Sequence, residues 1–485
     1  MERCEAEAVY EQGRDAVVSV LLALSAQNER LAAQVEALTA RVTRQDERIA
    51  TLERQLGRSS RNSSQPPSAD PPAAASPRRG KDASARKQGA QPGHEGHGRP
   101  RLPAWAVDEV IEHWPERCGC GHAFAEGERL TVGEPVRWQI EELPVISVRV
   151  TEHQCHRVRC PGCGQRTRAQ LPGEVAQSAF GPRFQSAVAT LSVRNRISRR
   201  DVVELCEQLF SSRISTGTVD AILARTAQAL TEPHADLLAA LRGAGAVNMD
   251  ETGWRTAGEQ RALWGIFDQR YAYLHVAPDR HEDHAKALLA DTNAIVTSDR
   301  WWAYAHLPLA RRQICWAHLK RDFAAHAEGL ALEREFGELG LHICERLFWA
   351  WEVFQHTGER RELRRQIAVL RRELKPALRR YSDKSPRNKH CRGMARNLLK
   401  LWPALWTFAA VPGVQPTNNH AERSLRGAVI YRKLSLGSQS EDGQQGIARL
   451  LSAHTTCRLQ HHSLFAYPTE LLATHARGEP PPSLA

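Results

Sequence analysis

Three carboxylates lie where short apolar segments end or where a helix begins, and these positions suit chemistry. Asp250 ends the segment AVNMD and Asp299 ends AIVTSD, so each is expected at a strand terminus, where loops and ligands meet. Glu422 lies in NNHAERSLR, within the first turns of an expected helix. Three carboxylates on neighbouring elements can hold two divalent cations, which activate the attacking oxygen and stabilise the leaving oxygen of a phosphodiester. Their oxygen atoms suit Mg²⁺ or Mn²⁺.

The surrounding elements favour this metal-binding role over the commoner role of a single acid as a solvated surface charge. Residues 247–280 read as three consecutive short strands, residues 281–292 as a helix and residues 294–301 as a fourth strand. Residues 311–319 read as another strand. A βββαβ order with acids on its first and fourth strands, followed by a glutamate on a later helix, matches a ribonuclease H-like catalytic core.

Two other acids are weaker candidates for the same site. Glu251 adjoins Asp250, but successive side chains of a strand point to opposite faces of a sheet, so Asp250 is preferred. Asp268, in the region of the third strand, ranks lower.

Two close cysteine pairs predict a second metal site. Cys118-Gly-Cys120-Gly precedes, and Cys160-Pro-Gly-Cys163-Gly follows, a stretch whose alternating apolar residues read as strands. Four thiolates in two pairs suit tetrahedral Zn²⁺, and the glycine after each pair lets backbone N–H groups approach sulfur. Four protein ligands leave no open coordination position, so the predicted zinc is structural. Alternative ligands for one position of the tighter first pair are His122, Cys155 and His156.

The N-terminal segment carries the seven-residue apolar repeat of a coiled coil. Leu24, Leu31 and Leu38 are seven residues apart, and the interleaved positions are mostly Val and Ile. This combination favours a parallel two-stranded coil and therefore a homodimer or higher oligomer. The alternative is a single amphipathic helix packed on the body of the protein, whose apolar stripe would drift from a strict heptad.

The segments that follow predict a linker and a DNA-binding region. Residues 57–103 are rich in Ser, Pro, Gly and basic residues, which predicts a flexible basic linker. Residues 173–242 read as helices, with N-caps at Ser198 and at Ser215 or Thr216, and resemble a helix-turn-helix. The predicted DNA contacts of this region are Arg199, Arg200, Thr216 and Thr218.

The overall charge agrees with a DNA partner. Among 485 residues, 66 Lys and Arg oppose 55 Asp and Glu, and the formal net charge of +11 favours a polyanion. An odd count of 11 cysteines argues against a disulfide framework. Neither an apolar run of about 18 residues nor a secretory signal is visible, so we expect a cytoplasmic, nucleoid-associated protein without a membrane partner.

Several segments resemble signature blocks of the IS66-type insertion-sequence transposases, a family of bacterial DDE transposases. These segments are MDETGWR, SDRWWAY, CWAHLKRDF and NNHAERSLRGAVIYRKLSLGSQSEDG. The spacing of Cys118 and Cys120 departs from the C-x-x-C expected there. The resemblance implies that Asp250, Asp299 and Glu422 are the catalytic acids and that a helical insertion separates the last two. It also implies helper proteins from the same element.

Together these patterns predict a multidomain α/β protein. Its predicted parts are a coiled-coil helix at 1–56, a linker at 57–103, a zinc module at 104–172, a helical DNA-binding segment at 173–242, a ribonuclease H-like DDE domain at 243–440 with a helical insertion at about 325–411, and a C-terminal helical tail at 441–485.

Side chains near the acids have predicted supporting roles. Trp301 and Trp302 follow Asp299 and either stack on an unpaired base or anchor the helical insertion. Cys315 and His318 read as core packing and support rather than as a metal pair. Phosphate-binding candidates after Glu422 are Arg423, Arg426, Arg432 and Lys433, of which Arg426, four residues on, could also brace Glu422.

The expected function is that of a DNA transposase. It would bind terminal inverted repeats, cleave the DNA to a free 3′-OH and transfer that end into target DNA. One alternative is a non-catalytic zinc and helix-turn-helix regulator, which leaves the strand-end acids unexplained. Another is a nuclease of the same fold, which would cleave without joining.

Overall fold

A computed structural model describes residues 3–56, 59, 62, 99–128, 130–176, 178–290, 292–329, 332–385 and 389–485. The chain forms two compact units. The larger unit comprises residues 1–75, 153–204 and 214–485, and the smaller unit comprises residues 76–152 and 205–213. Most of the predicted linker at 57–103 lies outside the described residues.

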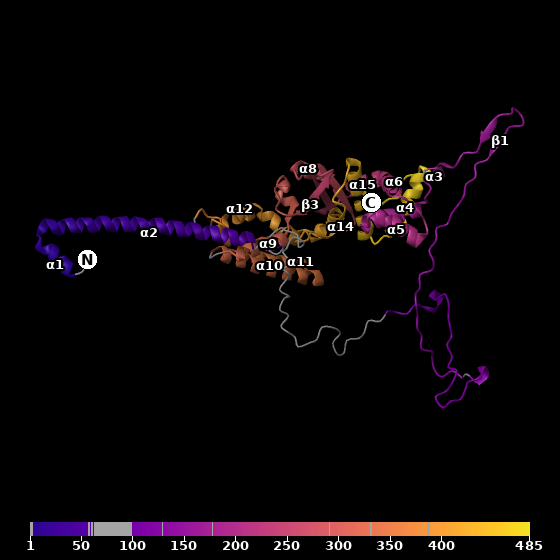
Figure 1. Ribbon diagram of the computed structural model, residues 1–485, viewed down its shortest axis with the longest axis horizontal. Helices are drawn as coiled ribbons and strands as arrows, with labels where there is room; N and C mark the ends of the chain where they lie inside the picture. The colour runs from indigo at the N-terminus through magenta and orange to yellow at the C-terminus, as the bar shows by residue number, and fades with distance from the viewer. Residues whose placement is uncertain are drawn as a thin grey trace. The chain divides into compact units, whose positions relative to one another are not determined.

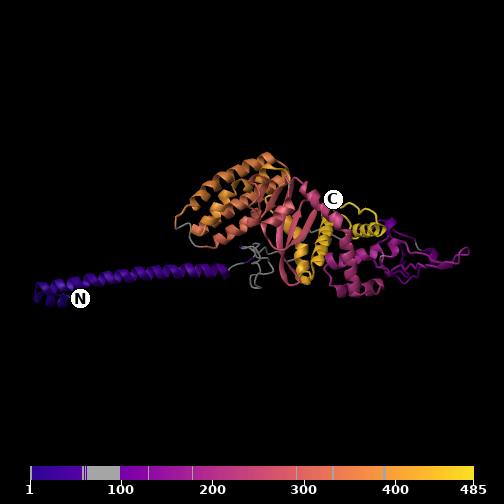
Figure 2. The same ribbon diagram turned by 90° about the horizontal axis from the view of Figure 1, so that it is seen from above.

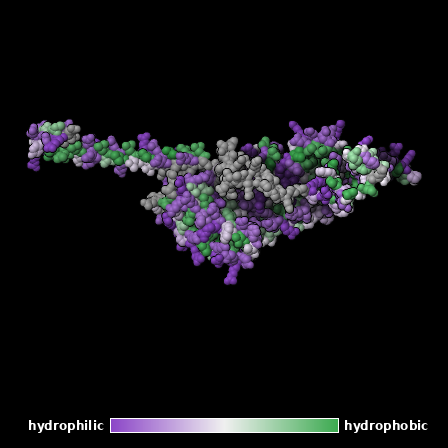
Figure 3. Space-filling model, turned by 90° about the horizontal axis from the view of Figure 1, so that it is seen from below, coloured by the Kyte–Doolittle hydropathy of each residue, from purple (hydrophilic) through white to green (hydrophobic). Residues whose placement is uncertain are grey.

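The N-terminal region is helical. Helix α1 spans Arg3–Glu11, and α2 spans Arg14–Leu56. Heptad side chains of α2 such as Leu31 and Leu38 are exposed, and green patches run along the helix in Figure 3. The exposed apolar stripe of this long helix is a surface that a partner helix would bury. The coiled coil stays a prediction.

Of the stretch between the two cysteine pairs that was predicted as strands, only the last three residues before Cys160 form a strand among the described residues. The described residues 130–156 contain no strand, and Trp138 and Ile140 are each 90% exposed. A strand needs a neighbour for its backbone hydrogen bonds, and alternation along one segment does not supply that neighbour. Two three-residue strands, β1 (Arg157–Arg159) and β2 (Arg166–Arg168), pair antiparallel around the second cysteine pair.

The segment at 173–242 is helical, as predicted. Ser198 Oγ accepts a hydrogen bond from Asp201 N at 3.2 Å, and Ser215 Oγ accepts one from Thr218 N at 3.1 Å. Both predicted N-caps are therefore confirmed, with Ser215 rather than Thr216 at the second. The helices are α3 (Gly173–Ala176), α4 (Pro182–Ala189), a π-helical turn at Thr190–Arg194, α5 (Arg199–Phe210), α6 (Thr216–Ala229) and α7 (Thr231–Arg242).

A five-stranded mixed sheet forms the centre of the larger unit (Figure 1). Its strand order is β5-β4-β3-β6-β7, with β3, β4 and β5 antiparallel and with β6 and β7 parallel to β3. The predicted βββαβ order is confirmed. The elements are β3 (Ala246–Thr256), β4 (Glu259–Phe267), β5 (Ala272–Ala277), α8 (Glu282–Leu289), β6 (Ile295–Ser298) and β7 (Arg312–Ile314).

Helices from the C-terminal part of the chain pack on this sheet. Helix α14 (Asn419–Ser435) contacts β3 and β4, and α15 (Glu441–Leu459) contacts β5. Hydroxyls of α15 also accept hydrogen bonds from the outer edge of β5: Ser452 Oγ from Leu274 N at 2.9 Å and Thr456 Oγ1 from Ala272 N at 3.0 Å. An edge strand covered in this way cannot recruit another chain. Helix α16 (Ala466–Arg477) follows.

A helical insertion separates β7 from α14 (Figure 2). Apolar residues of α11 recur with helical spacing and are buried, which gives the insertion its own core. A Cβ at Gly340 of α10 would lie 2.0 Å from the Phe323 ring of α9, so only glycine permits this close approach. The helices are α9 (Trp316–Ala327), α10 (Leu332–Thr357), α11 (Arg360–Tyr381), α12 (Arg392–Lys400) and α13 (Thr407–Ala410).

Candidate active site

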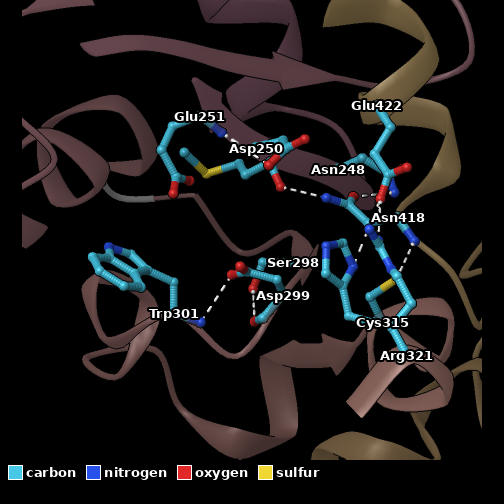
Figure 4. Close-up of polar contacts among 12 residues, drawn as sticks. Asn248, Asp250, Glu251, Ser298, Asp299, Trp301, Cys315, Arg321, Asn418 and Glu422 are labelled. Carbon is cyan, nitrogen blue, oxygen red and sulfur yellow. Dashed lines mark hydrogen bonds and ion pairs between the residues drawn. The ribbon is translucent and has the colours of Figure 1, made fainter. Parts of the chain in front are cut away.

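The three predicted carboxylates come from three elements that meet at the sheet. The parallel register of β3 and β6 ends at the pair Asn248 and Thr297, and Asp250 and Asp299 each follow two residues later, close enough for the charge of Asp299 to act on Asp250. Asp299 directly follows β6, as predicted, whereas Asp250 is the fifth of the eleven residues of β3. The prediction of Asp250 at a strand end was therefore wrong, because β3 continues through DETGWRT to pair with β4. Figure 4 shows Glu422 on the other side of Asp250 from Glu251.

Two asparagines join the start of α14 to β3. Asn418, fully buried, donates from Nδ2 to the Met249 carbonyl at 2.7 Å and accepts from Asn248 Nδ2 at 2.9 Å. Its backbone N–H lies 3.1 Å from Cys315 Sγ. Asn248 and Asp250 are two residues apart in β3, so their side chains lie on the same face of the sheet. The bonds of Asn418 to β3 therefore bring the first turn of α14, with Glu422, to the face that carries Asp250.

Burial and the neighbouring acids raise the pKa of Asp250 most clearly. Burial, followed by the charges of Glu251, Asp299 and Glu422, raises the pKa of Asp250 well above its ordinary value. Burial also raises the pKa of Asp299, although a hydrogen bond from Trp301 N and the charges of Arg312 and Arg300 oppose that rise. Carboxylates that are half-buried together favour a compensating cation.

The two lower-ranked acids have other partners. Glu251 accepts a hydrogen bond from the buried Tyr304 hydroxyl at 2.6 Å, on the opposite face of β3 from Asp250. Burial and the charge of Asp299 raise the pKa of Glu251 to about 7. Asp268 accepts hydrogen bonds from the backbone N–H groups of Arg270 and Tyr271, so it is a turn residue of the β4–β5 hairpin.

Arg321, which the sequence interpretation missed, is the cation that contacts Glu422. Its guanidinium donates to Glu422 Oε1 at 3.2 Å. It projects from α9 three residues after His318, whose Nδ1 is 3.7 Å from the same oxygen, too far for a hydrogen bond. Burial, with the charges of Arg321 and Arg300, lowers the pKa of His318 to about 3, so this imidazole is neutral. Arg321 lies in the segment CWAHLKRDF, which the sequence interpretation singled out. Its pairing with Glu422, however, arises only from tertiary packing.

Cys315 and Arg300 support the segments that carry the three acids. Burial raises the pKa of Cys315 to about 11, so its sulfur is a neutral packing group, as predicted. Arg300 donates to Asn397 of α12 and to Asp322 of α9, which fixes the chain directly after Asp299 to the insertion. The insertion therefore helps to position one of the three acids.

The donor set at this site fits a hard divalent cation. All three carboxylates supply oxygen, and their mutual repulsion at Asp250 is the electrostatic condition that such a cation relieves. Across the described residues, no three His, Cys, Asp or Glu side chains converge tightly enough to form a ready-made metal site. The cation site therefore stays a prediction.

The basic residues predicted on α14 differ in accessibility. Arg423 and Arg426 are exposed, and the Arg321 contact means that Glu422 does not depend on Arg426 as a brace. Arg432 is half-buried and donates to the Thr252 hydroxyl and the Gly253 carbonyl of β3. Lys433 is exposed.

The candidates of the helical segment also divide into two groups. Arg200 and Thr216 are exposed, whereas Thr218 is half-buried in the first turn of α6, where its backbone N–H donates to the N-cap Ser215. Arg199 donates to Asp220, Ser192 and Tyr431, so it ties the start of α5 to α6 and α14. Arg199 also lines a groove of about 1080 Å³ between α6 and the α14–α15 connection, and none of the three carboxylates lines this groove.

Both cysteine pairs adopt tight turns. Gly121 and Gly164 have φ values of +94° and +73°, which favour glycine, and both donate N–H groups back to the first cysteine of their pair. Backbone hydrogen bonds, from His122 and from Cys163 respectively, lower the pKa values of Cys120 and Cys160. The pairs belong to different compact units, so a shared zinc ion stays a prediction.

These features define a mixed α/β protein, mostly helical, in which acids group at a mixed sheet. The chain belongs to the Transposase IS66 family, whose model matches residues 177–446, more than half of its length. Residues 21–100 match a family of unknown function, DUF6444.

Two similar proteins come from Sinorhizobium fredii. "Uncharacterized protein y4hP" is 24% identical over 421 residues, covering 77% of this chain and 74% of that protein. "Uncharacterized protein y4jD" is 24% identical over 425 residues, covering 81% and 80%. None of the described helices is long and apolar enough to cross a membrane.

Proposed function

We propose that this protein is a DDE transposase with a ribonuclease H-like core, which binds the terminal inverted repeats of an insertion sequence and catalyses strand cleavage and strand transfer. Asp250, Asp299 and Glu422 are the catalytic acids. The observation that carries the proposal is the parallel register of β3 and β6, which brings Asp250 within reach of the charge of Asp299, together with the Asn418 bonds that hold the first turn of α14 on the same face.

The carboxylates would hold Mg²⁺ or Mn²⁺. When bound, these cations activate the attacking oxygen and stabilise the leaving oxygen of the phosphodiester. The chain's own residues set the geometry: Trp301 N orients Asp299, Asn418 fixes the helix that carries Glu422, and Arg321 orients the Glu422 carboxylate. Held groups of this kind lower the entropic cost of aligning the DNA strands.

Other parts of the chain would recognise and assemble the DNA ends. Exposed Arg423, Arg426, Arg200 and Thr216 are the more accessible of the predicted DNA contacts. The heptad stripe of α2 would pair with a second copy as a parallel coiled coil. Cys118, Cys120, Cys160 and Cys163 would hold a structural Zn²⁺, and helper proteins of the same element would assist a reaction in the bacterial cytoplasm.

A strand-transfer assay tests this function. Purified protein is incubated with Mg²⁺ and labelled DNA ends taken from beside the gene, in parallel with Glu422→Ala. Joined product from the wild type alone supports the proposal. Binding without cleavage by either protein would favour a non-catalytic regulator, and cleavage without joining would favour a nuclease of the same fold.

A further inference from the structure

Two adjacent tryptophans are exposed directly after Asp299. Trp301 is 39% exposed and Trp302 is 47% exposed, whereas Trp254, Trp264 and Trp316 of the same unit are at most 1% exposed. A large aromatic side chain on the surface, beside a group of acids, points to a binding role rather than to core packing.

The backbone of this pair is fixed to the acids. Trp301 N donates to Asp299 Oδ1 at 2.9 Å. Trp302 begins a short 3₁₀ helix that ends at the buried Tyr304, whose hydroxyl donates to Glu251 at 2.6 Å. In Figure 4 the indole of Trp301 lies on the Glu251 side of the site, away from Glu422. The two side chains are therefore held in place while their surfaces stay accessible.

Among the described residues, the ring contacts of this pair are to each other and to α8, not to the helical insertion. The centroids of the two indoles are 6.1 Å apart at 46°, and Trp302 meets His281, the N-cap of α8, edge-on at 5.3 Å. Neither contact is a parallel stack. The insertion is joined to this loop through Arg300 instead. Of the two predicted roles for the tryptophans, the exposed positions favour stacking on a base.

Positive charge lies on the same side of the site. Arg280 is exposed, adjoins His281, and is close enough for its charge to act on both Glu251 and Arg432. Exposed aromatic rings beside cations are the combination that binds single-stranded nucleic acid, because bases stack on the rings while phosphates meet the charges.

We propose that Trp301 and Trp302 form a stacking platform for an unpaired nucleobase of the DNA end that is cut at Asp250, Asp299 and Glu422. This inference rests on the proposed transposase function and deepens it, because it specifies a DNA end that is locally unpaired at the site. The platform tolerates any base, since every base has an aromatic face. Stacking on the protein offsets part of the cost of unpairing that base.

The first experiment compares cleavage of two DNA ends by Trp301→Ala, Trp302→Ala and the wild type. On a fully paired end, each variant is expected to cleave roughly tenfold to hundredfold more slowly, the range for losing one base–aromatic stack. On an end with an abasic site at the unpaired position, the variants should match the wild type, because there is no base to stack. Trp349→Ala, which removes a 60% exposed tryptophan from α10, is the matched control and should behave as wild type on both ends.

A second measurement does not need catalysis. The fluorescent base 2-aminopurine is placed at each terminal nucleotide of the element in turn, and emission is recorded as protein binds. The platform is supported if emission changes at one position when the wild type or Trp349→Ala binds. That change should be absent when the Trp301→Ala, Trp302→Ala double variant binds. If this tryptophan-dependent emission change is seen but the wild type does not cleave DNA, the proposed transposase function is rejected. The stacking platform is then still supported.

Two results overturn the platform while the transposase function stands. One is an equal defect of the tryptophan variants on paired and abasic ends, which would mean a structural role. The other is wild-type cleavage and a wild-type emission change in the tryptophan variants, which would show that no base stacks on this pair. Absence of any tryptophan-dependent emission change overturns the platform whatever the catalytic result.

Discussion

The two flanks of the carboxylate site are built differently. On the Glu422 flank, buried or half-buried groups hold the acid: Arg321 donates to it, and Asn418 ties its helix to β3. On the Asp299 flank, the backbone is held but Trp301 and Trp302 are exposed. One flank is closed by internal partners, and the other is open to a ligand.

The two flanks therefore have different tasks: the groups of one fix the position of an acid, and the groups of the other leave the acids accessible to a ligand. The closed flank needs long-range partners, since Arg321 and Glu422 are far apart in the chain and meet only through the packing of α9 and α14. On the open flank, a two-residue contact orients the Asp299 side chain, while Arg300 ties the backbone after Asp299 to the insertion. Substitutions on the closed flank should change stability and geometry, and those on the open flank should change DNA handling.

The largest effect is expected at the acids shared by both flanks. Asp250→Asn and Asp299→Asn each keep the shape of the side chain but remove charge from the cation site, so strand transfer should fall at least about a thousandfold. Asp268→Asn, in a hairpin turn, is the control and should transfer normally. Gel-based joining assays measure the rates, and normal transfer by either of the first two variants would remove that residue from the site.

A smaller loss is expected when the closed flank loses its cation. Arg321→Met keeps the length of the side chain but leaves Glu422 unoriented, and loss of such a supporting bond typically costs about 10–100-fold in metal affinity or activity. The Mg²⁺ concentration for half-maximal cleavage should shift, and calorimetry should show altered Mg²⁺ binding. Arg346→Met, which breaks the Arg346–Glu373 pair of the insertion, should change neither. An unchanged Mg²⁺ requirement in Arg321→Met would contradict the role.

Stability should respond at Asn418. Asn418→Ala leaves the Met249 carbonyl and Asn248 without buried partners, which costs about 1–3 kcal/mol of unfolding free energy. Asn195→Ala, at an exposed position, is the matched control and should change stability by less than about 0.5 kcal/mol. Urea denaturation of both variants measures the difference. Equal stability would show that the closed flank does not depend on this asparagine.

The smallest effect is expected from a charge on the open flank. Arg280→Ala should weaken DNA binding a few-fold and reduce the slope of log K against log salt by about one, because one phosphate contact is lost. Arg321→Met should leave that slope unchanged, since its guanidinium faces Glu422. Binding titrations over a range of salt concentrations compare them. A reduced slope in Arg321→Met alone would reverse the assignment of the two flanks.

Local patterns in the sequence predicted much of the larger unit. The apolar segments before Asp299 and around Asp250 predicted their strands, and the serines before α5 and α6 predicted the N-caps. These signals are local because burial period and capping chemistry act within a few residues. The same approach failed at Trp138 and Ile140, since their alternation has no partner strand among the described residues 130–156.

The sequence by itself therefore determined the family, the βββαβ order of the sheet, and the three candidate acids. Tertiary structure decided that Asp250 lies within β3, that Arg321 rather than Arg426 contacts Glu422, and that Trp301 and Trp302 are exposed. The physical reason is the range of the interactions. Side-chain periodicity depends on residues that are close in the sequence. Ion pairs between distant helices and the exposure of a ring are determined only when the whole unit has packed.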